Sequence, residues 1–184
     1  MHSLAGDVAA GSRSEMKFIL VDRIVSIEPG ARIVTSKSLT LAEEYLADHF
    51  PTFPVMPGVL MLEAMVQSAA WLVRVTQDFG HSMVVLEEAR NINYKSFIVP
   101  GKTLEVTVEA LRIEDHTSEF KAFGRSDEQE MVKARLKLRH YNLGESDENL
   151  AVTDKALVAD NRKRFELLGG PAALTMAATL VNNG

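Results

Sequence analysis

One apolar helix constrains the fold of this chain more than any other feature. Residues 58–79 predict a single helix, because Pro57 suits the first turn of a helix and Gly80 suits its C-terminal cap. Apolar side chains occupy nearly every side of this segment. A helix without a polar face is normally wrapped by other structure, so the rest of the chain is expected to cover it.

The segments on either side of this helix alternate between apolar and polar residues, as strands do. A short helix over 41–46, capped by Thr40 with Glu43 as in a capping box, is expected just before the proline-rich segment that leads into the long helix. The expected strands are 17–27, 32–39, 83–86, 92–97, 103–113, 117–125 and 130–141, with turns at residues 28–30 and 126–128. A sheet curled around one apolar helix buries both elements. The predicted fold class is therefore α+β, an antiparallel sheet wrapped around one long central helix, which is the hot-dog arrangement.

The two ends of the chain differ in character from this central part. Residues 1–15 are small and polar and are expected to form a loose N-terminal arm, followed by the main domain over 16–143. Residues 144–184 predict a helical extension, with Thr153 or Asp154 capping a helix that the glycines after Leu168 end.

Composition excludes several classes of function. The chain has 184 residues and a formal net charge of −5, which opposes a large nucleic-acid interface. It contains no cysteine, so disulfides and thiolate chemistry are excluded. The N-terminus lacks the basic and apolar regions of a secretory signal. Glu63, Gln67 and Arg74 interrupt the apolar helix, which makes it a poor membrane span and a good buried helix. A cytoplasmic protein is expected.

The residues that suggest chemistry lie at the start of the long helix. His49 stands in a proline-stiffened loop and is the side chain best suited to exchange a proton at neutral pH. Glu63 lies within the apolar helix, where burial would raise its pKa and suit it as a proton donor. Gln67, one turn further on, is placed to orient Glu63. Gly58 offers a free backbone N–H to a carbonyl oxygen.

These parts together suit acid–base elimination of water from a 3-hydroxyacyl thioester. His49 would remove the proton next to the carbonyl, and Glu63, or a water it holds, would protonate the departing hydroxyl. Taken singly, however, each residue has a commoner structural explanation. A loop histidine, a partly exposed helical glutamate and a glutamine that satisfies backbone groups are all ordinary features.

The segment from His49 to Gln67, HFPTFPVMPGVLMLEAMVQ, closely resembles the signature of the bacterial β-hydroxyacyl-[acyl-carrier-protein] dehydratases of the FabZ type. The resemblance extends over about residues 18–141. It implies that His49 and Glu63 are catalytic, that Gly58 holds the thioester carbonyl and that Gln67 supports the site. The sister family that also isomerises the double bond has aspartate at the position of Glu63, so dehydration without isomerisation is expected.

The resemblance also implies the partners. The substrate would be carried on the phosphopantetheine arm of acyl carrier protein, and no metal or other cofactor is expected. Family members form homodimers, commonly assembled into hexamers as trimers of dimers, with each site taking its histidine from one subunit and its glutamate from the other. The residues expected to line the acyl tunnel are Phe50, Phe53, Met56 and Met61. Arg90 and Lys95 are candidates to contact the acidic carrier protein.

The sequence leaves two other functions open. A hot-dog acyl thioesterase would hydrolyse the thioester and would leave the pairing of His49 with Glu63 unexplained. A non-catalytic acyl-carrier or acyl-binding subunit would not need His49, Gly58 and Glu63 together. A polyketide or specialised lipid pathway would use the same chemistry as fatty-acid synthesis.

Overall fold

The computed structural model describes residues 18–48 and 53–174 of the chain. Its helices and strands are β1 (Arg23–Glu28), β2 (Arg32–Ser38), α1 (Tyr45–Asp48), α2 (Gly58–Thr76), β3 (Met83–Tyr94), β4 (Thr103–Ile113), β5 (Thr117–Ser126), β6 (Gln129–Tyr141), the 3-10 turns η1 (Leu143–Glu145) and η2 (Glu148–Leu150), and α3 (Ala151–Leu167).

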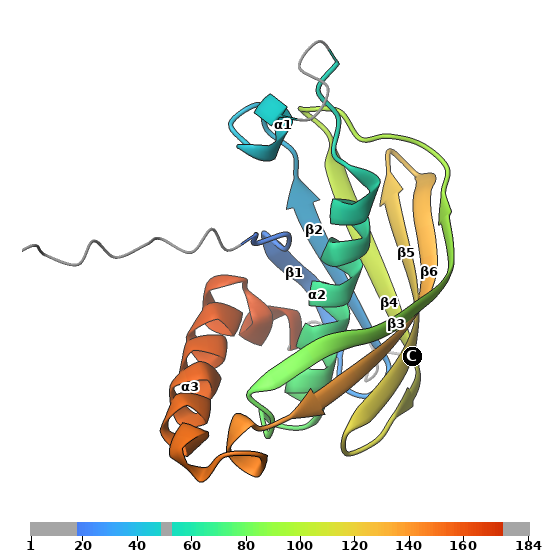
Figure 1. The fold of residues 1–184 in the computed structure, drawn as a ribbon. Helices are drawn as coiled ribbons and strands as arrows, with labels where there is room; N and C mark the ends of the chain where they lie inside the picture. Colours follow the sequence, from blue (N-terminus) through green and yellow to red (C-terminus); the bar gives the residue numbers. More distant parts are fainter. Residues whose placement is uncertain (1–17, 49–52, 175–184) are drawn as a thin grey trace, which may run out of the picture.

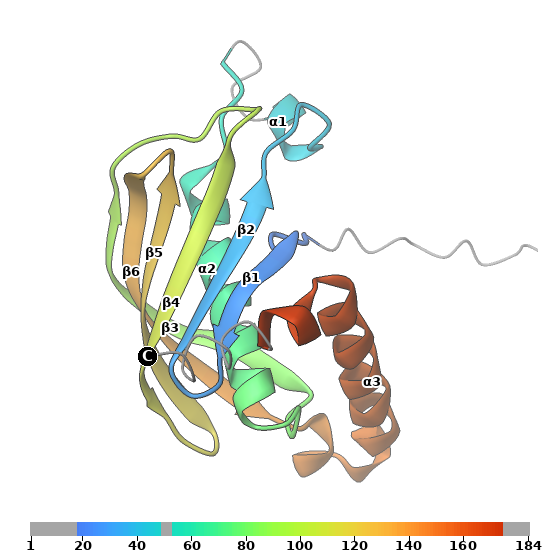
Figure 2. The ribbon, with the colours of Figure 1, turned by 180° about the vertical axis from the view of Figure 1, so that it is seen from behind.

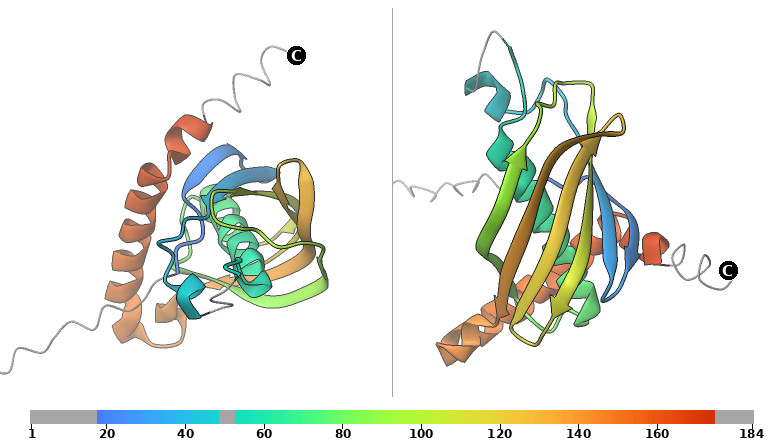
Figure 3. Two further views of the ribbon diagram at one scale, coloured as in Figure 1. Left: turned by 90° about the horizontal axis from the view of Figure 1, so that it is seen from above. Right: turned by 90° about the vertical axis from the view of Figure 1, so that its right-hand side faces the viewer.

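The six strands form one antiparallel sheet in the order β1-β2-β4-β5-β6-β3. The sheet curves around α2, which crosses its concave side (Figure 1). From behind, β4 and β2 cover the helix (Figure 2). Viewed from above, the sheet encloses α2 on several sides and α3 stands on the open side (Figure 3). The predicted hot-dog fold is confirmed.

Alternation along the strands explains why the sheet holds the helix. On β4, Leu104, Val106 and Val108 are buried and the residues between them are more exposed. They face the buried side of α2, whose residues 64–66 and 68–73 are all buried. By length and mean hydropathy (1.3) α2 would pass for a membrane-crossing helix, but 56% of that stretch is buried inside the domain. Its apolar character is therefore accounted for by the core.

The structure corrects several predicted boundaries. The two strands expected at 83–86 and 92–97 are one strand, β3, with irregular pairing and a positive φ of 52° at Asn91. The helix expected from Leu41 begins only at Tyr45, because Glu43 does not complete a capping box and instead pairs with Lys37. The long helix ends at Thr76 rather than at Phe79.

That early end has a local cause. Asp78 and Phe79 both have positive φ, and the N–H of Phe79 bonds back to the carbonyl of Arg74. The left-handed residues that turn the chain away are thus Asp78 and Phe79, and Gly80 is not the cap that the sequence predicted.

The segment after β6 folds back against α2 and β1. Phe165 of α3 is buried between Trp71 and Phe79, with ring centroids 6.2 and 5.8 Å away. The N–H of Ile24 in β1 donates to the carbonyl of Leu168 at 2.8 Å. The expected helix is present, but neither Thr153 nor Asp154 caps it, since it begins at Ala151.

Asp154 does not act as the predicted helix cap but binds the loops that precede α3 and β3. Its carboxylate accepts hydrogen bonds from the backbone N–H groups of Leu143 (2.9 Å) and Gly144 (2.7 Å) and from the hydroxyl of Ser82. It therefore fixes the start of the C-terminal segment to the loop before β3. Residues 1–15, the predicted arm, lie outside the described residues.

Candidate active site

Glu63 and Gln67 lie one turn apart on α2 and share a hydrogen bond. The Gln67 Nε2 donates to Glu63 Oε1 at 3.0 Å and also to the carbonyl of Phe18 at 2.8 Å. The Gln67 Oε1 accepts from the backbone N–H of Leu20 at 2.9 Å. Every hydrogen-bonding group of the amide thus has a partner, which fixes its orientation. Gln67 therefore holds one oxygen of Glu63 in place and leaves Oε2 available to a substrate.

Glu63 opens into a hollow between α2, α3 and the segment before β1. Its side chain is partly buried, so the deep burial expected from the apolar helix is wrong for the single chain. Residues that line the hollow include Phe18, Glu63, Gln67, Trp71, Arg74, Asn161 and Arg164. The acid on α2 is therefore accessible.

Two arginines give this hollow a positive character. Burial and the nearby charge of Arg164 lower the pKa of Arg74 to about 10. The Arg74 guanidinium lies 5.1 Å from the centre of the Trp71 ring, and its buried Nε has no hydrogen-bond partner among the described residues. Two guanidinium groups at one hollow attract an anion or a polarised oxygen.

Gly58 opens into a second cleft at the start of α2. The cleft is about 380 Å³ in volume and mostly apolar, and it is lined by residues 58, 59, 61 and 94–97. A Cβ placed on Gly58 would lie 3.0 Å from the Tyr94 ring. Glycine thus allows close approach at this point. The N–H of Gly58 has no acceptor among the described residues, as expected for the first residue of a helix.

The loop that leads to Gly58 is anchored to the segment between β3 and β4. Met56 is fully buried, and its N–H donates to the carbonyl of Ile98 at 2.8 Å. Pro57 then occupies the position before the first helical residue. Because Pro57 has a fixed φ and Met56 is anchored, the direction of the Gly58 N–H is set by the fold.

The two hollows lie on different sides of α2. Positions 58 and 63 are five residues apart, which at about 3.6 residues per turn places the two residues about 140° apart around the axis. Gly58 faces Tyr94 of β3, whereas Glu63 faces residue 18 and α3. Within one chain the structure therefore does not bring the N–H of Gly58, the predicted carbonyl donor, and Glu63, the predicted acid, into one hollow.

The other predicted site residues have mixed positions. His49 and Phe50 lie outside the described residues. Phe53 is 60% exposed, whereas Met56 and Met61 are buried in the core, and Met61 also borders the Gly58 cleft. Arg90 forms an exposed ion pair with Glu88 (2.7 Å) and Lys95 one with Glu130 (2.6 Å). Lys95 borders the cleft and Arg90 does not.

Sequence reasoning missed three residues of these hollows. Arg74 follows Glu63 and Gln67 at positions i+11 and i+7, so helical spacing would have placed it on their face. Arg164 comes from α3, and no sequence pattern links it to α2. Tyr94 was assigned to a strand, and only the structure places its ring over Gly58.

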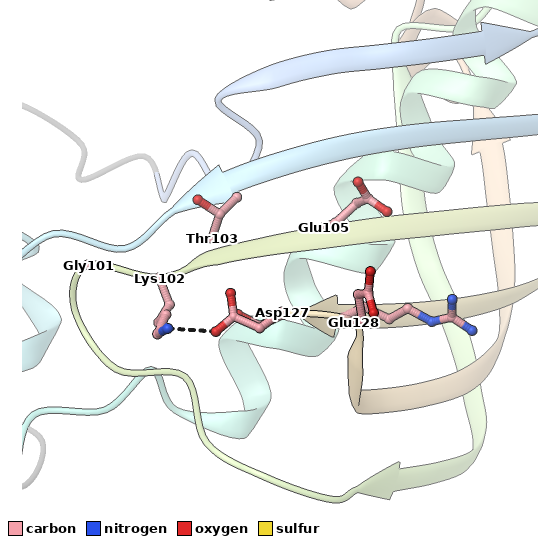
Figure 4. Close-up of a pocket in the computed structure, with 8 residues that line it drawn as sticks. Gly101, Lys102, Thr103, Glu105, Asp127 and Glu128 are labelled. Carbon is pink, nitrogen blue, oxygen red and sulfur yellow. Dashed lines mark ion pairs between the residues drawn. The ribbon is translucent and has the colours of Figure 1, made fainter.

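A larger hollow near the β5–β6 turn is not this site. It is lined by residues 101–103, 105 and 125–128, and an exposed ion pair between Lys102 and Asp127 (2.6 Å) crosses it (Figure 4). Thr103 and Glu105 are exposed, whereas Leu104 between them is buried. The hollow therefore lies on the side of the sheet away from α2 and Glu63.

Comparison with known proteins now decides the family. The FabA-like domain matches residues 13–135, well over half of the chain. The chain belongs to the FabA-like family.

Individual FabA-like relatives agree. The 3-hydroxyacyl-[acyl-carrier-protein] dehydratase FabZ of Anaeromyxobacter sp. (strain Fw109-5) is 40% identical over 99 residues, 52% of this chain and 63% of that protein. The chain thus spans just under two thirds of that relative. The FabZ of Aromatoleum aromaticum is 37% identical over 123 residues, 65% of this chain and 84% of that protein.

Solved structures with a similar fold are more distant in sequence. The dehydratase heterocomplex ApeI:P from Xenorhabdus doucetiae superposes with a TM-score of 0.60 at 14% identity, covering 72% of this chain and 90% of that one. The protein smu.793 from Streptococcus mutans UA159, bound to acetyl CoA, superposes with a TM-score of 0.52 at 19% identity, covering 69% and 94%. At these identities the similarity supports the hot-dog fold alone.

Proposed function

We propose that this protein dehydrates 3-hydroxyacyl thioesters carried on acyl carrier protein to trans-2-enoyl thioesters. The observation that carries the proposal is the contact between Gln67 and Glu63, which places one oriented carboxyl group on the central helix of a FabA-like fold. The FabZ relatives act on the same kind of substrate, by their names. Such an activity belongs to cytoplasmic fatty-acid synthesis.

The chemistry needs only proton transfer. The N–H of Gly58 would bind the thioester carbonyl oxygen and stabilise the charge that develops there. His49 would remove the proton from C2, the carbon next to the carbonyl. Glu63, held at Oε1 by Gln67, would deliver a proton from Oε2 to the 3-hydroxyl as the bond from C3 to oxygen breaks. A C2–C3 double bond forms and water leaves, so atoms and charges balance with no metal or redox cofactor.

The separation of Gly58 from Glu63 argues for a site built by two subunits. Gly58 and Glu63 line different hollows of one α2, so in the proposed site a second copy brings its own Glu63 to the Gly58 cleft. The protein is therefore proposed to act as a homodimer, and three such dimers would form the hexamer that the FabZ resemblance implies.

The edge strand β3 offers the dimer contact. It is twelve residues long, has β6 as its one neighbour among the described strands, and carries exposed apolar side chains such as Leu86, Ile92 and Tyr94. A long apolar edge strand is normally covered, since its free backbone groups pair readily with another strand. Pairing of β3 with β3 of a second copy would also bring the two Gly58 clefts near the interface.

The carrier protein is proposed to approach at the Gly58 cleft. Lys95 borders the cleft and is 44% exposed at its side chain, so it can exchange Glu130 for the phosphate of a phosphopantetheine arm or an acidic carrier residue. Arg90 lies outside the cleft and would contact only a more distant part of the carrier. The apolar lining at Met61 and Phe97 suits an acyl chain.

The test is hydration of a trans-2-enoyl thioester, on carrier protein or a short pantetheine mimic, followed by loss of the enoyl absorbance. Wild type is expected to turn over, and Glu63→Gln and His49→Ala are each expected to lose roughly 10²–10⁴-fold in rate. Glu44→Gln, an exposed glutamate outside the site, is the matched control and is expected to keep wild-type rates.

Other outcomes point to the alternatives. Release of free thiol from the enoyl thioester, with no 3-hydroxyacyl thioester formed, would identify an acyl thioesterase instead. Tight binding of acylated carrier protein, with no turnover at any chain length by a folded oligomer, would identify a non-catalytic acyl-binding subunit. Either result would overturn the dehydratase proposal.

A further inference from the structure

Three histidines lie close together near the C-terminal end of α2, away from Gly58. His81 follows α2, His116 lies in the turn between β4 and β5, and His140 lies near the end of β6. The ring centroid of His81 is 5.4 Å from that of His116 and 5.1 Å from that of His140. At about 1.5 Å per residue, the end of α2 lies about 20 Å beyond Glu63, so the cluster takes no part in the proposed dehydration.

Two of these histidines and a glutamate present metal-ligand atoms to one another. One ring nitrogen each of His81 and His116 and a carboxylate oxygen of Glu145 all lie within 4.8 Å of one another. His116 and Glu145 are exposed and His81 is partly exposed, so their side chains can adjust. A zinc ion binds imidazole nitrogen and carboxylate oxygen at about 2.0–2.2 Å, which the three side chains reach with small rotations.

The hydrogen bonds of His81 prepare it as a ligand. Its Nδ1 lies 3.1 Å from Gln77 Oε1. The Nε2 of Gln77 donates to the carbonyl of Glu114 at 2.8 Å, which turns Oε1 of the amide toward the histidine. The His81 Nδ1 must therefore be the protonated nitrogen, and Nε2 keeps its lone pair. Metal-binding histidines are commonly oriented by such a second hydrogen bond.

His116 and Glu145 are prepared in the same way. The His116 Nδ1 lies 3.3 Å from the carbonyl of His140, which can only accept, so its Nε2 also keeps a lone pair. Glu145 Oε1 accepts from the N–H of Asn142 at 2.9 Å, which leaves Oε2 for a metal. The side chain of Asn142 in turn bonds the loop on either side of His81, at Gly80 and Ser82.

Electrostatics favours the neutral form of the His81 imidazole. Burial lowers the pKa of His81, the nearby His116 lowers it further, and Glu145 and Asp115 act in the opposite direction. A neutral imidazole is the form that binds metal. The carboxylates of Glu145 and Asp115 lie close enough to act on His81 and would supply negative charge beside a bound cation.

We propose that His81, His116 and Glu145 bind one divalent transition-metal ion of the zinc class. Two imidazoles and a carboxylate are a ligand set that zinc accepts, with a remaining position for water. The ion would join the end of α2, the β4–β5 turn and the start of the C-terminal segment. The site is a structural clip, and it does not depend on the proposed dehydratase function.

The experiment uses the full chain without an affinity tag, stripped with a chelator. Zn²⁺ is titrated in competition with a chromophoric chelator, and Co²⁺ is titrated while its visible absorption bands are recorded. We expect one ion per chain, an imidazole-type Co²⁺ spectrum and a rise of several degrees in the thermal unfolding midpoint with saturating Zn²⁺. The dehydratase rate of the stripped protein is expected to stay unchanged.

Variants separate this site from chance binding. His116→Ala and Glu145→Gln alter exposed side chains, so both should fold, and each is expected to lose at least roughly tenfold in Zn²⁺ affinity together with the midpoint shift. Gln77→Leu, which touches no metal, is expected to weaken binding by a similar factor. Glu148→Gln, an exposed glutamate of η2, is the control and should bind as wild type does.

Two results would overturn the proposal. One is the absence of stoichiometric Zn²⁺ binding in the chelator competition. The other is binding that survives both His116→Ala and Glu145→Gln, which would place the ion elsewhere, for example at His2 in the N-terminal segment.

Discussion

The amide of Gln67 connects the acid Glu63 to the backbone of the segment that precedes β1. Its Nε2 donates to Glu63 Oε1 at 3.0 Å and its Oε1 accepts from the N–H of Leu20 at 2.9 Å. One side chain thus orients the carboxyl group and anchors the chain next to it. Orientation of Glu63 and local stability should respond together when Gln67 is changed.

Gln67→Ala is therefore expected to lower kcat more than it raises KM, because Glu63 loses the group that holds it in the transition state. It should also cost about 1–3 kcal/mol in the free energy of unfolding, since the N–H of Leu20 is left without its partner. The measurements are steady-state hydration kinetics and urea unfolding. Gln129→Ala, at the exposed first residue of β6, serves as the control. Lower stability with an unchanged kcat would make Gln67 purely structural.

Two ion pairs of equal length should differ in energy. Lys37 Nζ lies 2.6 Å from Glu43 Oε1 with 7% of the lysine side chain exposed, and it also contacts Asp22 at 3.3 Å. Lys102 Nζ lies 2.6 Å from Asp127 with 50% exposed (Figure 4). Exposed pairs contribute about 0–1 kcal/mol, whereas a buried charge that loses its partner costs several times more.

Lys37→Met is accordingly expected to lower the free energy of unfolding by about 1–3 kcal/mol, a loss kept moderate because Asp22 remains partly solvated. Lys102→Met is expected to lower it by less than about 0.5 kcal/mol. Urea unfolding of both variants at neutral pH and at two salt concentrations measures the contrast. Equal losses from the two substitutions would contradict the burial argument.

Much of this architecture follows from local patterns. Strand β4 spans 103–113 as alternation predicts, and the polar turn at Asp127 and Glu128 has both residues at positive φ, as a two-residue hairpin needs. The extent of β3 was harder to predict. Asn91 lies at the gap between the strands expected at 83–86 and 92–97, but it marks only an irregularity in the pairing, and β6 pairs with β3 on both sides of it.

The site was predictable only along α2. Helical spacing placed Glu63 and Gln67 on one face, and their hydrogen bond follows from that spacing. The contacts to Phe18 and Leu20, the ring of Tyr94 over Gly58 and the approach of Arg164 depend on which distant segments pack on the helix. The histidine cluster was not predicted for the same reason, since its members are far apart in sequence.

The C-terminal segment is expected to contribute to stability through Phe165. This ring is buried against Trp71 and Phe79, and a Cβ on Gly170 would lie only 2.2 Å from it. Gly170→Ala must displace the ring and should cost about 1–3 kcal/mol, and Phe165→Ala about 3–5 kcal/mol. Thermal unfolding measures both losses. Glu166→Ala, on the exposed side of α3, is the control. Gly101→Ala is not suitable as a control, because Gly101 has a positive φ. An unchanged midpoint in Gly170→Ala would mean that α3 does not pack as described.

Stability should also fall in mild acid because of His140. Burial lowers the pKa of His140, and His81 and His116 lower it further, whereas hydrogen bonding to the backbone at Asp115 acts against this. A histidine with a depressed pKa in the folded state is more readily protonated when unfolded. Its contribution is therefore present above about pH 6.5, the unfolded value, and is lost as the pH falls toward the folded pKa.

Urea unfolding of chelator-treated protein between pH 5 and 8 measures this dependence. The groups that face His140 are His81, His116 and the hydroxyl of Ser118, 2.9 Å from its Nε2, with Asp115 and Glu145 close to the same cluster. His140→Gln keeps a partner for Ser118 and is expected to flatten the stability curve below about pH 6.5. A curve as steep as that of wild type would assign the dependence to another group.

The separation of Gly58 from Glu63 around α2 leads to the sharpest prediction about assembly. If a site joins the His49 loop and Gly58 of one subunit to Glu63 of the other, a mixed dimer of His49→Ala and Glu63→Gln contains one site with both changes and one with neither. Random mixing makes half of the dimers mixed, so about one quarter of wild-type activity should return from two inactive proteins. The variants are unfolded and refolded together, and the rate is compared with that of each variant refolded alone. A mixture that stays inactive, although exchange of subunits is verified by mass, would place His49 and Glu63 of the same chain in one site.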